Sequence, residues 1–352
     1  MYWVFGRLMR KVGVTGLAGV LLSLVACGRQ PAQNPYPAEP EKTSGGQTWT
    51  LSSPQGENVG LLDRFTDFVK LNNSEELSVA EGARAPNEIW HHNDAGNLAS
   101  DADYARANEL LNQQRYADAK ELLKEIVNRN AGSSSVWRRL GDAYYNLLEL
   151  SSAISAYEKA VSLNRENYFA IRGLAFAYLY HGHDLWNARR PAEAHGEYGK
   201  SLKLLQQCMR IYPGDVEAMY GRGMAAEGAS RRLYQNALAL LGQGKKQEAA
   251  SAARNCFGVI DEGVEVLRQR VSKANKEIGP RNVIGGLFQR RAILGSRFQY
   301  RDAALDSIDQ AVRVYESILK IDPENALAKK ELEKCTKMRD SLEAETAPGG
   351  EK

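Results

Sequence analysis

The sequence predicts an all-α fold over residues 101–345, in which antiparallel helical hairpins stack into a solenoid. Three observations predict it. Ala, Leu, Glu, Lys and Arg dominate this stretch, and it lacks strand-like alternation of apolar and polar residues. Small and aromatic residues recur in it at a spacing of about 34 residues. Its few prolines stand where we expect helices to begin or end. They are Pro191, Pro213, Pro280 and Pro323.

Residues 1–26 have the layout of a secretory signal peptide. Three basic residues, Arg7, Arg10 and Lys11, precede an apolar run over residues 12–26. A helix that spans a membrane needs about 20 apolar residues, so this run is too short to be one. We therefore expect the chain to be exported.

The apolar run ends in Leu24-Val25-Ala26-Cys27-Gly28, which resembles the lipobox of bacterial lipoproteins. The resemblance implies that the chain is cut before Cys27 and that the Cys27 thiol is diacylated. Two or three acyl chains anchor a protein firmly, at about 0.8 kcal/mol per buried CH₂. Gly28, being other than Asp, implies an outer-membrane anchor that faces the periplasm in a Gram-negative host. The alternative is an ordinary signal peptide with a chance cysteine.

The segments on either side of the helical region have simpler patterns. Residues 27–58 are rich in Pro, Gly, Ser and Gln and predict a flexible, disordered tether. Residues 59–100 predict one short amphipathic helix, within 59–71, followed by loops. This helix either docks on the main domain, which we favour, or binds a partner. Residues 346–352 predict a disordered tail.

The charge balance gives no support for a nucleic-acid partner. The chain has 46 basic and 43 acidic residues, and three of the basic residues lie in the signal peptide, which leaves 43 of each sign. The sequence also has no basic stripe with interleaved aromatic residues, the usual footprint of such binding.

Three cysteines, Cys208, Cys256 and Cys335, lie in the helical region and far apart from one another. No C-x-x-C pair is present, so the pattern favours small apolar core residues over metal, redox or haem sites. An exported protein can form one disulfide from such a set, but the spacing does not decide the pairing.

One stretch carries a recognisable repeat motif. Trp137, Leu140, Gly141 and Tyr144 form a W-x₂-L-G-x₂-Y run, and Tyr157 follows between two alanines at small-residue positions. The segment resembles the tetratricopeptide repeat, a pair of antiparallel helices. Small residues let the two helices approach closely, and the aromatic residues fill the space around the contact. The small residues are Gly141, Ala153 and Ala160.

A single repeat cannot cover its own apolar face, so several must stack. Counting about 34 residues back and forward finds a pair over 100–133 and the first helix of a third pair. The register then breaks over residues 181–198, and the second helix of the third pair resumes over residues 201–215, which suggests lengthened helices. A fourth, long pair follows from Asp215, a fifth spans about 282–321, and a last helix from Glu324 caps the array. The alternative is a plain helical bundle with a chance repeat-like stretch.

Histidines are few but clustered, which raises the possibility of a metal site. His181, His183 and Asp184 lie together, with His195 nearby in sequence. A metalloenzyme would require the three histidines to converge. Residues two apart on a helix diverge, so a polar turn between helices is the better interpretation. His91, His92 and Asp94 form a second group. No nucleotide-binding, zinc-protease or serine-hydrolase motif occurs, so we predict no enzyme, no metal and no cofactor.

The resemblance implies a curved array whose concave face, lined by the first helix of each pair, grips a peptide or a partner helix. We expect the residues that the core pattern leaves free to line it. They are Arg138, Asp142, Tyr145, Asn146, Phe169, Arg172, Phe176, Tyr180 and Tyr220.

The leading hypothesis is therefore a membrane-anchored periplasmic scaffold or assembly factor for an envelope complex, binding envelope proteins or peptide segments. The alternative is a lipoprotein that binds a small molecule or lipid and serves transport. An enclosed apolar cavity within residues 175–240 would favour that alternative, and an open face rich in Tyr and Arg the scaffold.

Overall fold

The computed structural model of this 352-residue chain describes residues 101–344. The chain divides into two units, Met1–Leu71 and Asn72–Lys352, and all described residues belong to the second. The predictions for the signal peptide, Cys27, the tether, the helix within 59–71 and the C-terminal tail lie outside the described residues. So does the group of His91, His92 and Asp94.

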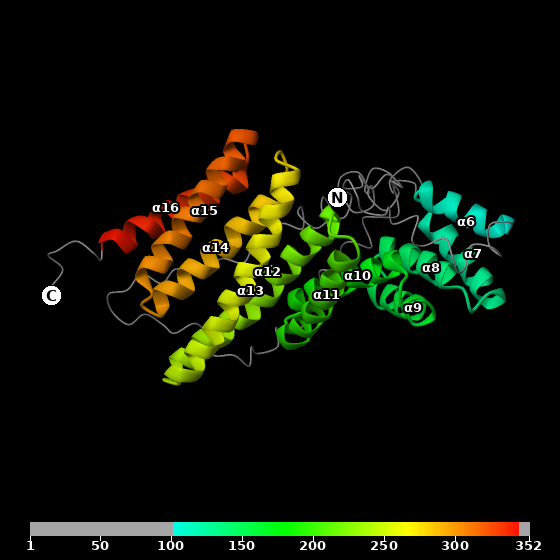
Figure 1. The fold of residues 1–352 in the computed structure, drawn as a ribbon, viewed down its shortest axis with the longest axis horizontal. Coiled ribbons are helices and arrows are strands. Elements are labelled where there is room, and N and C mark those ends of the chain that lie inside the picture. Colours follow the sequence, from blue (N-terminus) through cyan, green and yellow to red (C-terminus); the bar gives the residue numbers. More distant parts are fainter. Residues whose placement is uncertain (1–100, 345–352) are drawn as a thin grey trace, which may run out of the picture. The chain divides into compact units, whose positions relative to one another are not determined.

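The described residues form eleven α-helices and no strand, which confirms the all-α prediction (Figure 1). Five pairs of helices are followed by one last helix. The pairs are α6 Ala102–Asn112 with α7 Tyr116–Arg129, α8 Ser134–Asn146 with α9 Leu150–Leu163, α10 Tyr168–Asn187 with α11 Pro191–Ile211, α12 Val216–Gly242 with α13 Lys246–Lys273, and α14 Gly279–Arg297 with α15 Arg301–Ile321; the last helix is α16 Ala326–Ala344.

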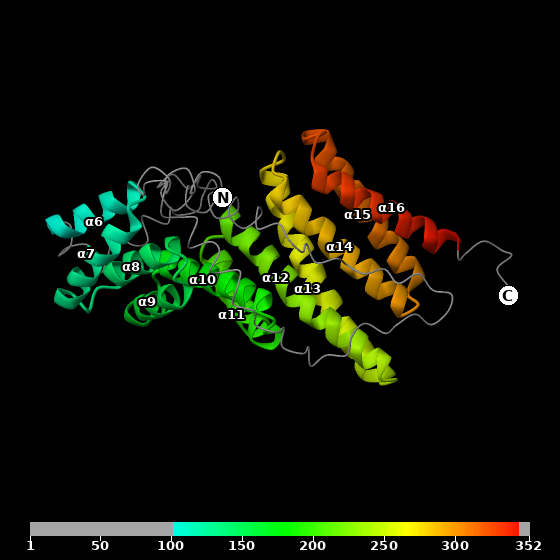
Figure 2. The ribbon, with the colours of Figure 1, turned by 180° about the vertical axis from the view of Figure 1, so that it is seen from behind.

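Each pair packs as an antiparallel hairpin, and each second helix also packs against the first helix of the next pair. The first helices touch one another in turn, from α6 to α8, α10, α12, α14 and α16. Figure 2 shows the same succession from behind. Every pair thus covers the apolar face of its neighbour, as expected for a stacked repeat.

All five hairpin turns have the same backbone geometry. Each turn has three residues, and its second residue has a φ between 60° and 74°. The third residue donates its N–H to a carbonyl five residues back, as Arg115 does to Leu110 at 2.8 Å. This is the Schellman ending of a helix. The left-handed residues are Gln114, Leu148, Arg189, Gly244 and Gln299.

The loops that link one pair to the next have their own repeated chemistry. Five of the six first helices begin at an Asp, Ser or Asn whose side chain accepts a backbone N–H of the first turn, which is the preferred N-cap. The caps are Asp101, Ser133, Asn167, Asp215 and Asn325. The exception is α14, which begins after Ile278 without a side-chain cap. No second helix has such a cap within the described array.

Aromatic side chains of the second helices fill slots above glycines of the first helices. A Cβ on Gly141 would lie 2.6 Å from the Tyr157 ring, and one on Gly173 of the next pair equally close. Tyr198 packs in the same way against Gly182 and Gly228, at 2.8 and 2.5 Å. The predicted close approach at Gly141 is therefore confirmed, and each ring joins two consecutive pairs.

The helices grow in steps of seven residues. The second helices have 14, 14, 21, 28 and 21 residues, and α8, α10 and α12 have 13, 20 and 27. Seven residues are about 20° short of two full turns, so an added step leaves the same face toward the partner helix. The lengthening predicted from the broken register is confirmed.

Two details of the sequence prediction are wrong. Residues 181–184 do not form a turn, because α10 continues through them to Asn187. The second helix of the third pair begins at Pro191, earlier than the stretch of residues 201–215 in which the pattern placed it. Both errors have one cause: the added seven residues on each helix have no counterpart in the 34-residue pattern.

Replacing a left-handed leucine by glycine should stabilise the fold. Leu148 has a φ of 63° and is 59% exposed, so Leu148→Gly removes backbone strain and loses little burial. We expect the free energy of unfolding to rise by about 0.5–1 kcal/mol, measured from the urea midpoint. The control is Leu147→Gly, at a right-handed φ of −85°, which should lower the free energy of unfolding. An unchanged or lower value for Leu148→Gly would contradict the prediction.

Filling a glycine slot should destabilise the array. Gly141→Ala forces its methyl group into the Tyr157 ring, and we expect a loss of about 1–3 kcal/mol in the free energy of unfolding. Gly196→Ala is the matched control, because a Cβ there meets nothing within 4 Å. It should be neutral or stabilising, by up to about 1 kcal/mol. Equal effects of the two substitutions would refute the slot as a packing determinant.

Candidate functional site

The nine predicted binding residues lie on α8, α10 and α12, and we call the surface that they define the first-helix face. Four of them remain partly exposed: Arg138, Asn146, Phe169 and Tyr220. The other five are buried, with Asp142 9%, Arg172 4%, Phe176 2%, Tyr180 5% and Tyr145 0% exposed. These five side chains are therefore placed to support the face rather than to form its outer surface.

Arg138 and Phe169 form the accessible centre of the first-helix face. The Arg138 guanidinium lies 5.7 Å from the centroid of the Phe169 ring, and the Arg172 guanidinium lies 5.4 Å from it. Such cation–π contacts contribute about 0.5–2 kcal/mol each. Arg138 also pairs with Asp142 at 3.0 Å. The arrangement presents a half-buried aromatic ring held under two positive charges.

Asp142 and Arg172 are both held by residues of other helices. The Tyr157 hydroxyl donates to Asp142 at 2.8 Å. Arg172 lies 3.3 Å from Asp215, the residue that caps α12, and the Tyr168 hydroxyl donates to the same carboxylate. Burial and this carboxylate together raise the pKa of Tyr168 well above its usual range, so the hydroxyl remains a donor. Both charged groups are therefore positioned by the fold.

Tyr145, Tyr180 and Phe176 belong to the core between α8, α10 and α12. The Tyr145 and Tyr180 rings meet edge to face, with centroids 5.9 Å apart. Phe176 fills the space above Gly221, where a Cβ would lie 2.8 Å from its ring. Their burial comes from the neighbouring pairs, which the pattern of one helix does not reveal.

Tyr220 lies apart from the other predicted residues, in a second charged cluster. The Arg270 guanidinium lies 5.3 Å from the Tyr220 ring, and Arg270 pairs with Glu217 at 2.8 Å and with Glu277 at 2.6 Å. Arg270 also donates to the Val216 carbonyl. This cluster joins the start of α12 to the end of α13 and the loop before α14.

The sequence analysis missed three residues of the face, Tyr104, Asn108 and Arg139. Asn108 Oδ1 and Arg139 Nε, together with Asn146 Oδ1, are buried atoms with no hydrogen-bond partner in the described part of the chain. Burial and the adjacent Arg138 guanidinium lower the pKa of Arg139, while Asp142 and Tyr104 oppose this. The repeat itself could have revealed two of them, because Tyr104 and Asn108 precede Arg138 and Asp142 by one repeat of about 34 residues.

The histidines in the described residues make separate contacts. The Tyr198 hydroxyl and His183 Nδ1 lie 3.0 Å apart, and His181 Nδ1 lies 3.6 Å from a Glu197 oxygen. Burial lowers the pKa of His195. Within residues 101–344, no group of three or more His, Cys, Asp or Glu side chains is arranged to hold a metal ion.

The three cysteines of the helical region are buried, unpaired thiols on α11, α13 and α16. Burial raises the pKa of Cys208 and of Cys256 to about 12 and that of Cys335 to about 11. The predicted role of small apolar core residues is confirmed, and no disulfide joins them.

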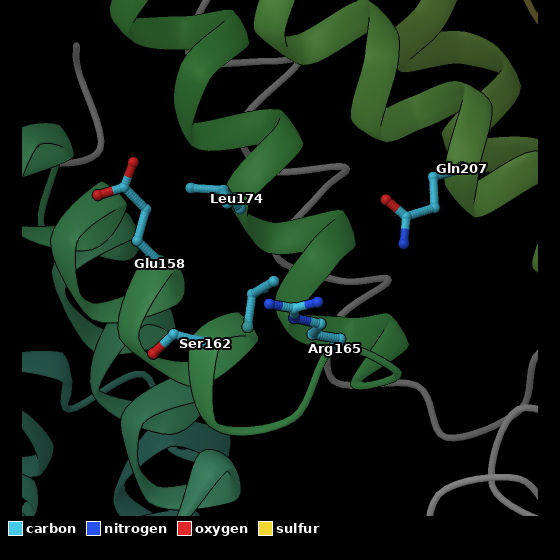
Figure 3. Close-up of a pocket in the computed structure, with 6 residues that line it drawn as sticks. Glu158, Ser162, Arg165, Leu174 and Gln207 are labelled. Carbon is cyan, nitrogen blue, oxygen red and sulfur yellow. The ribbon is translucent and has the colours of Figure 1, made fainter.

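Two depressions lie on the opposite side of the array, among the second helices. The larger, about 350 Å³, lies over α10 between α9 and α11 (Figure 3). Its lining residues are Glu158, Val161, Ser162, Arg165, Leu174 and Gln207. The other, about 270 Å³, lies among α13, α14 and α15 and is lined largely by charged residues. Both are open to solvent, and neither is an enclosed apolar cavity of residues 175–240.

The helices of the described array are not suited to crossing a bilayer: none combines sufficient length with sufficient hydropathy. This finding concerns residues 101–344 only.

Residues 104–168 match the tetratricopeptide repeat family. This stretch runs from α6 to the start of α10, so the match covers the first two pairs and confirms the resemblance carried by Trp137 and Tyr157. The later pairs share the same hairpin turns, whose left-handed residue and carbonyl contact recur in α10–α11, α12–α13 and α14–α15. No curated protein sequence matches the chain.

Several solved structures are similar in fold. A fragment of MamA from Desulfovibrio magneticus has 16% identity and a TM-score of 0.42, over 62% of this chain and 95% of that one. YrrB, described as a repeat protein with an unusual peptide-binding site, has 16% identity and a TM-score of 0.40, over 76% and 96%. PilW, a type IV pilus biogenesis factor, has 14% identity and a TM-score of 0.30, over 72% of this chain and 96% of that one.

Proposed function

We propose that this protein is a membrane-anchored periplasmic lipoprotein that holds an envelope protein through the first-helix face of α6, α8 and α10. The tetratricopeptide repeats of the first two pairs support a protein-binding role. The signal peptide and the lipobox-like sequence at Cys27 support export and anchoring. The partner is a protein segment that lies across α6, α8 and α10.

The observation that carries the proposal is the partly exposed pair at the centre of this face, in which the Arg138 guanidinium lies 5.7 Å from the Phe169 ring. An extended peptide offers backbone C=O groups, which the Arg138 guanidinium can meet as a hydrogen-bond donor. α8 and α10 touch, which brings these two side chains onto one surface.

The Arg138–Phe169 centre adds selectivity to this backbone contact. Aromatic and Arg side chains are the usual hot spots of protein interfaces. The half-buried ring offers an apolar contact, and the guanidinium groups over it favour an acidic or carbonyl-rich segment. We prefer this function to ligand transport because the two depressions are open and lie on the other side of the array.

A photo-crosslinking residue at position 169 should capture the partner. With benzoylphenylalanine in place of Phe169, we expect one defined adduct in intact cells. Adding Arg138→Ala should weaken it about 5- to 30-fold, because the variant removes a guanidinium contact to the partner of about 1–2 kcal/mol. The control places the same residue at Leu163, which is 38% exposed at the end of α9. Identical adducts from both positions would contradict a binding role for the first-helix face.

The anchor is tested separately. In a bacterium that processes lipoproteins, the wild-type chain should incorporate labelled palmitate and remain with the membranes at high salt. Cys27→Ser should abolish both the label and the cut before residue 27. Cys208→Ser, which changes a buried core thiol, should keep both. Retention of the label in Cys27→Ser would rule out the proposed anchor while leaving the peptide-binding face untouched.

A further inference from the structure

The end of the α12–α13 hairpin extends past both neighbouring hairpins. Tyr198 contacts Gly182 of α10 and Gly228 of α12, so these glycines lie at one level. From that level α10 ends five residues later, at Asn187, whereas α12 runs 14 residues further, to Gly242. Figures 1 and 2 both show the yellow-green end of the pair beyond its neighbours.

The α12–α13 hairpin also extends past its other neighbour, the α14–α15 hairpin. Arg290 of α14 donates to Ser230 of α12 at 2.7 Å, which sets these two residues at one level. From there α14 ends seven residues later and α12 runs 12 residues further. We call the part without flanking hairpins, residues 236–253, the finger. Its last turns extend about 7 Å past α14, at 1.5 Å per residue, and further past α10.

The finger has few charges, and they lie near its tip. Its charged residues are Lys245, Lys246 and Glu248. Lys245 lies 4.0 Å from Glu248, and Lys246 makes no ion pair within the described residues. Gly242 and Gly244 at the tip have nothing within 4 Å of a Cβ position. The tip is thus slender, open and positively charged.

The sides of the finger are aliphatic. Ala237, Ala249 and Ala253 are fully buried in the contact between its two helices. Leu238, Leu240 and Leu241 remain half-buried around it. At 100° per residue, Leu238 and Leu240 point about 160° apart around α12. A partner helix would need the leucines on one side, so their distribution fits a fluid apolar medium better.

We propose that the finger is a membrane contact that inserts its tip among the headgroups of an anionic lipid surface. Lysines near such a surface interact favourably with acidic lipids, and the leucines just behind the tip replace contact with water by contact with the apolar parts of the interfacial region. The inference is independent of the partner-binding face, which lies on α6, α8 and α10. It is also independent of the anchor, because it rests on residues 236–253 alone.

The test is hydrogen exchange of the full chain reconstituted in vesicles of phosphatidylcholine, with and without phosphatidylglycerol. Whatever the N-terminal segment contributes is common to both vesicle types. We expect amide exchange in residues 236–253 to be at least about tenfold slower with phosphatidylglycerol. Lys245→Glu with Lys246→Glu should abolish this difference. Lys273→Glu with Lys276→Glu, two exposed lysines at the opposite end of the pair, should keep it.

A second variant tests the aliphatic sides. Leu238→Ser with Leu240→Ser should also abolish the slower exchange, whereas Leu148→Ser, at the turn of a shorter hairpin, should not. Exchange that is equal in the two vesicle types, or slowed equally in the Lys245/Lys246 variant, would overturn the proposal. So would protection of the finger that requires an added protein, since the occupant would then be that protein.

Discussion

The array depends on the contact between an aromatic ring of a second helix and the glycines of two first helices. Tyr157 lies over Gly141 of its own pair and Gly173 of the next, and Tyr198 over Gly182 and Gly228. One ring thereby sets the distance within a hairpin and the distance to the following hairpin. Its hydroxyl then meets a polar side chain of the first helix, Asp142 for Tyr157 and His183 for Tyr198. The slot determines spacing, and the hydrogen bond determines the level at which the ring lies.

This constraint explains how the helices can lengthen without disturbing the stack. Gly141 and Gly182 each lie five residues before the end of their helix, so the slot keeps its distance from the hairpin turn and the additional residues lie between the cap and the slot. Additions of seven keep the facing surfaces aligned to within about 20°. The same turn then closes each hairpin, with a left-handed second residue in every case. The finger exists because α12 and α13 each have one more such step than the helices of either neighbouring pair.

The distribution of charge separates two kinds of arginine in the described array. Arg172, Arg270 and Arg290 are almost fully buried, and each is paired with a carboxylate of another element. The Arg172 and Arg290 pairs join consecutive hairpins, and the Arg270–Glu217 pair joins the two helices of one hairpin. Removing one partner would leave a buried charge uncompensated. Arg138 and Arg139 are different, since they share one carboxylate, Asp142, at 3.0 and 3.5 Å. The excess positive charge of the first-helix face therefore lies at its α6–α8 end.

The sequence by itself determined what depends on short-range pattern: the all-α class, the repeat around Trp137, the proline-marked helix boundaries and the close approach at Gly141. Helical period, turn chemistry and side-chain size act within a few residues, so the sequence of one segment is enough to predict their effects. Only the tertiary structure decided which residues of the first-helix face remain accessible. Arg172 is buried because Asp215, 43 residues away, meets it, and Tyr145 because α10 covers it. Burial is set by neighbouring pairs that a helix's own sequence does not specify, and for that reason the site needed the fold.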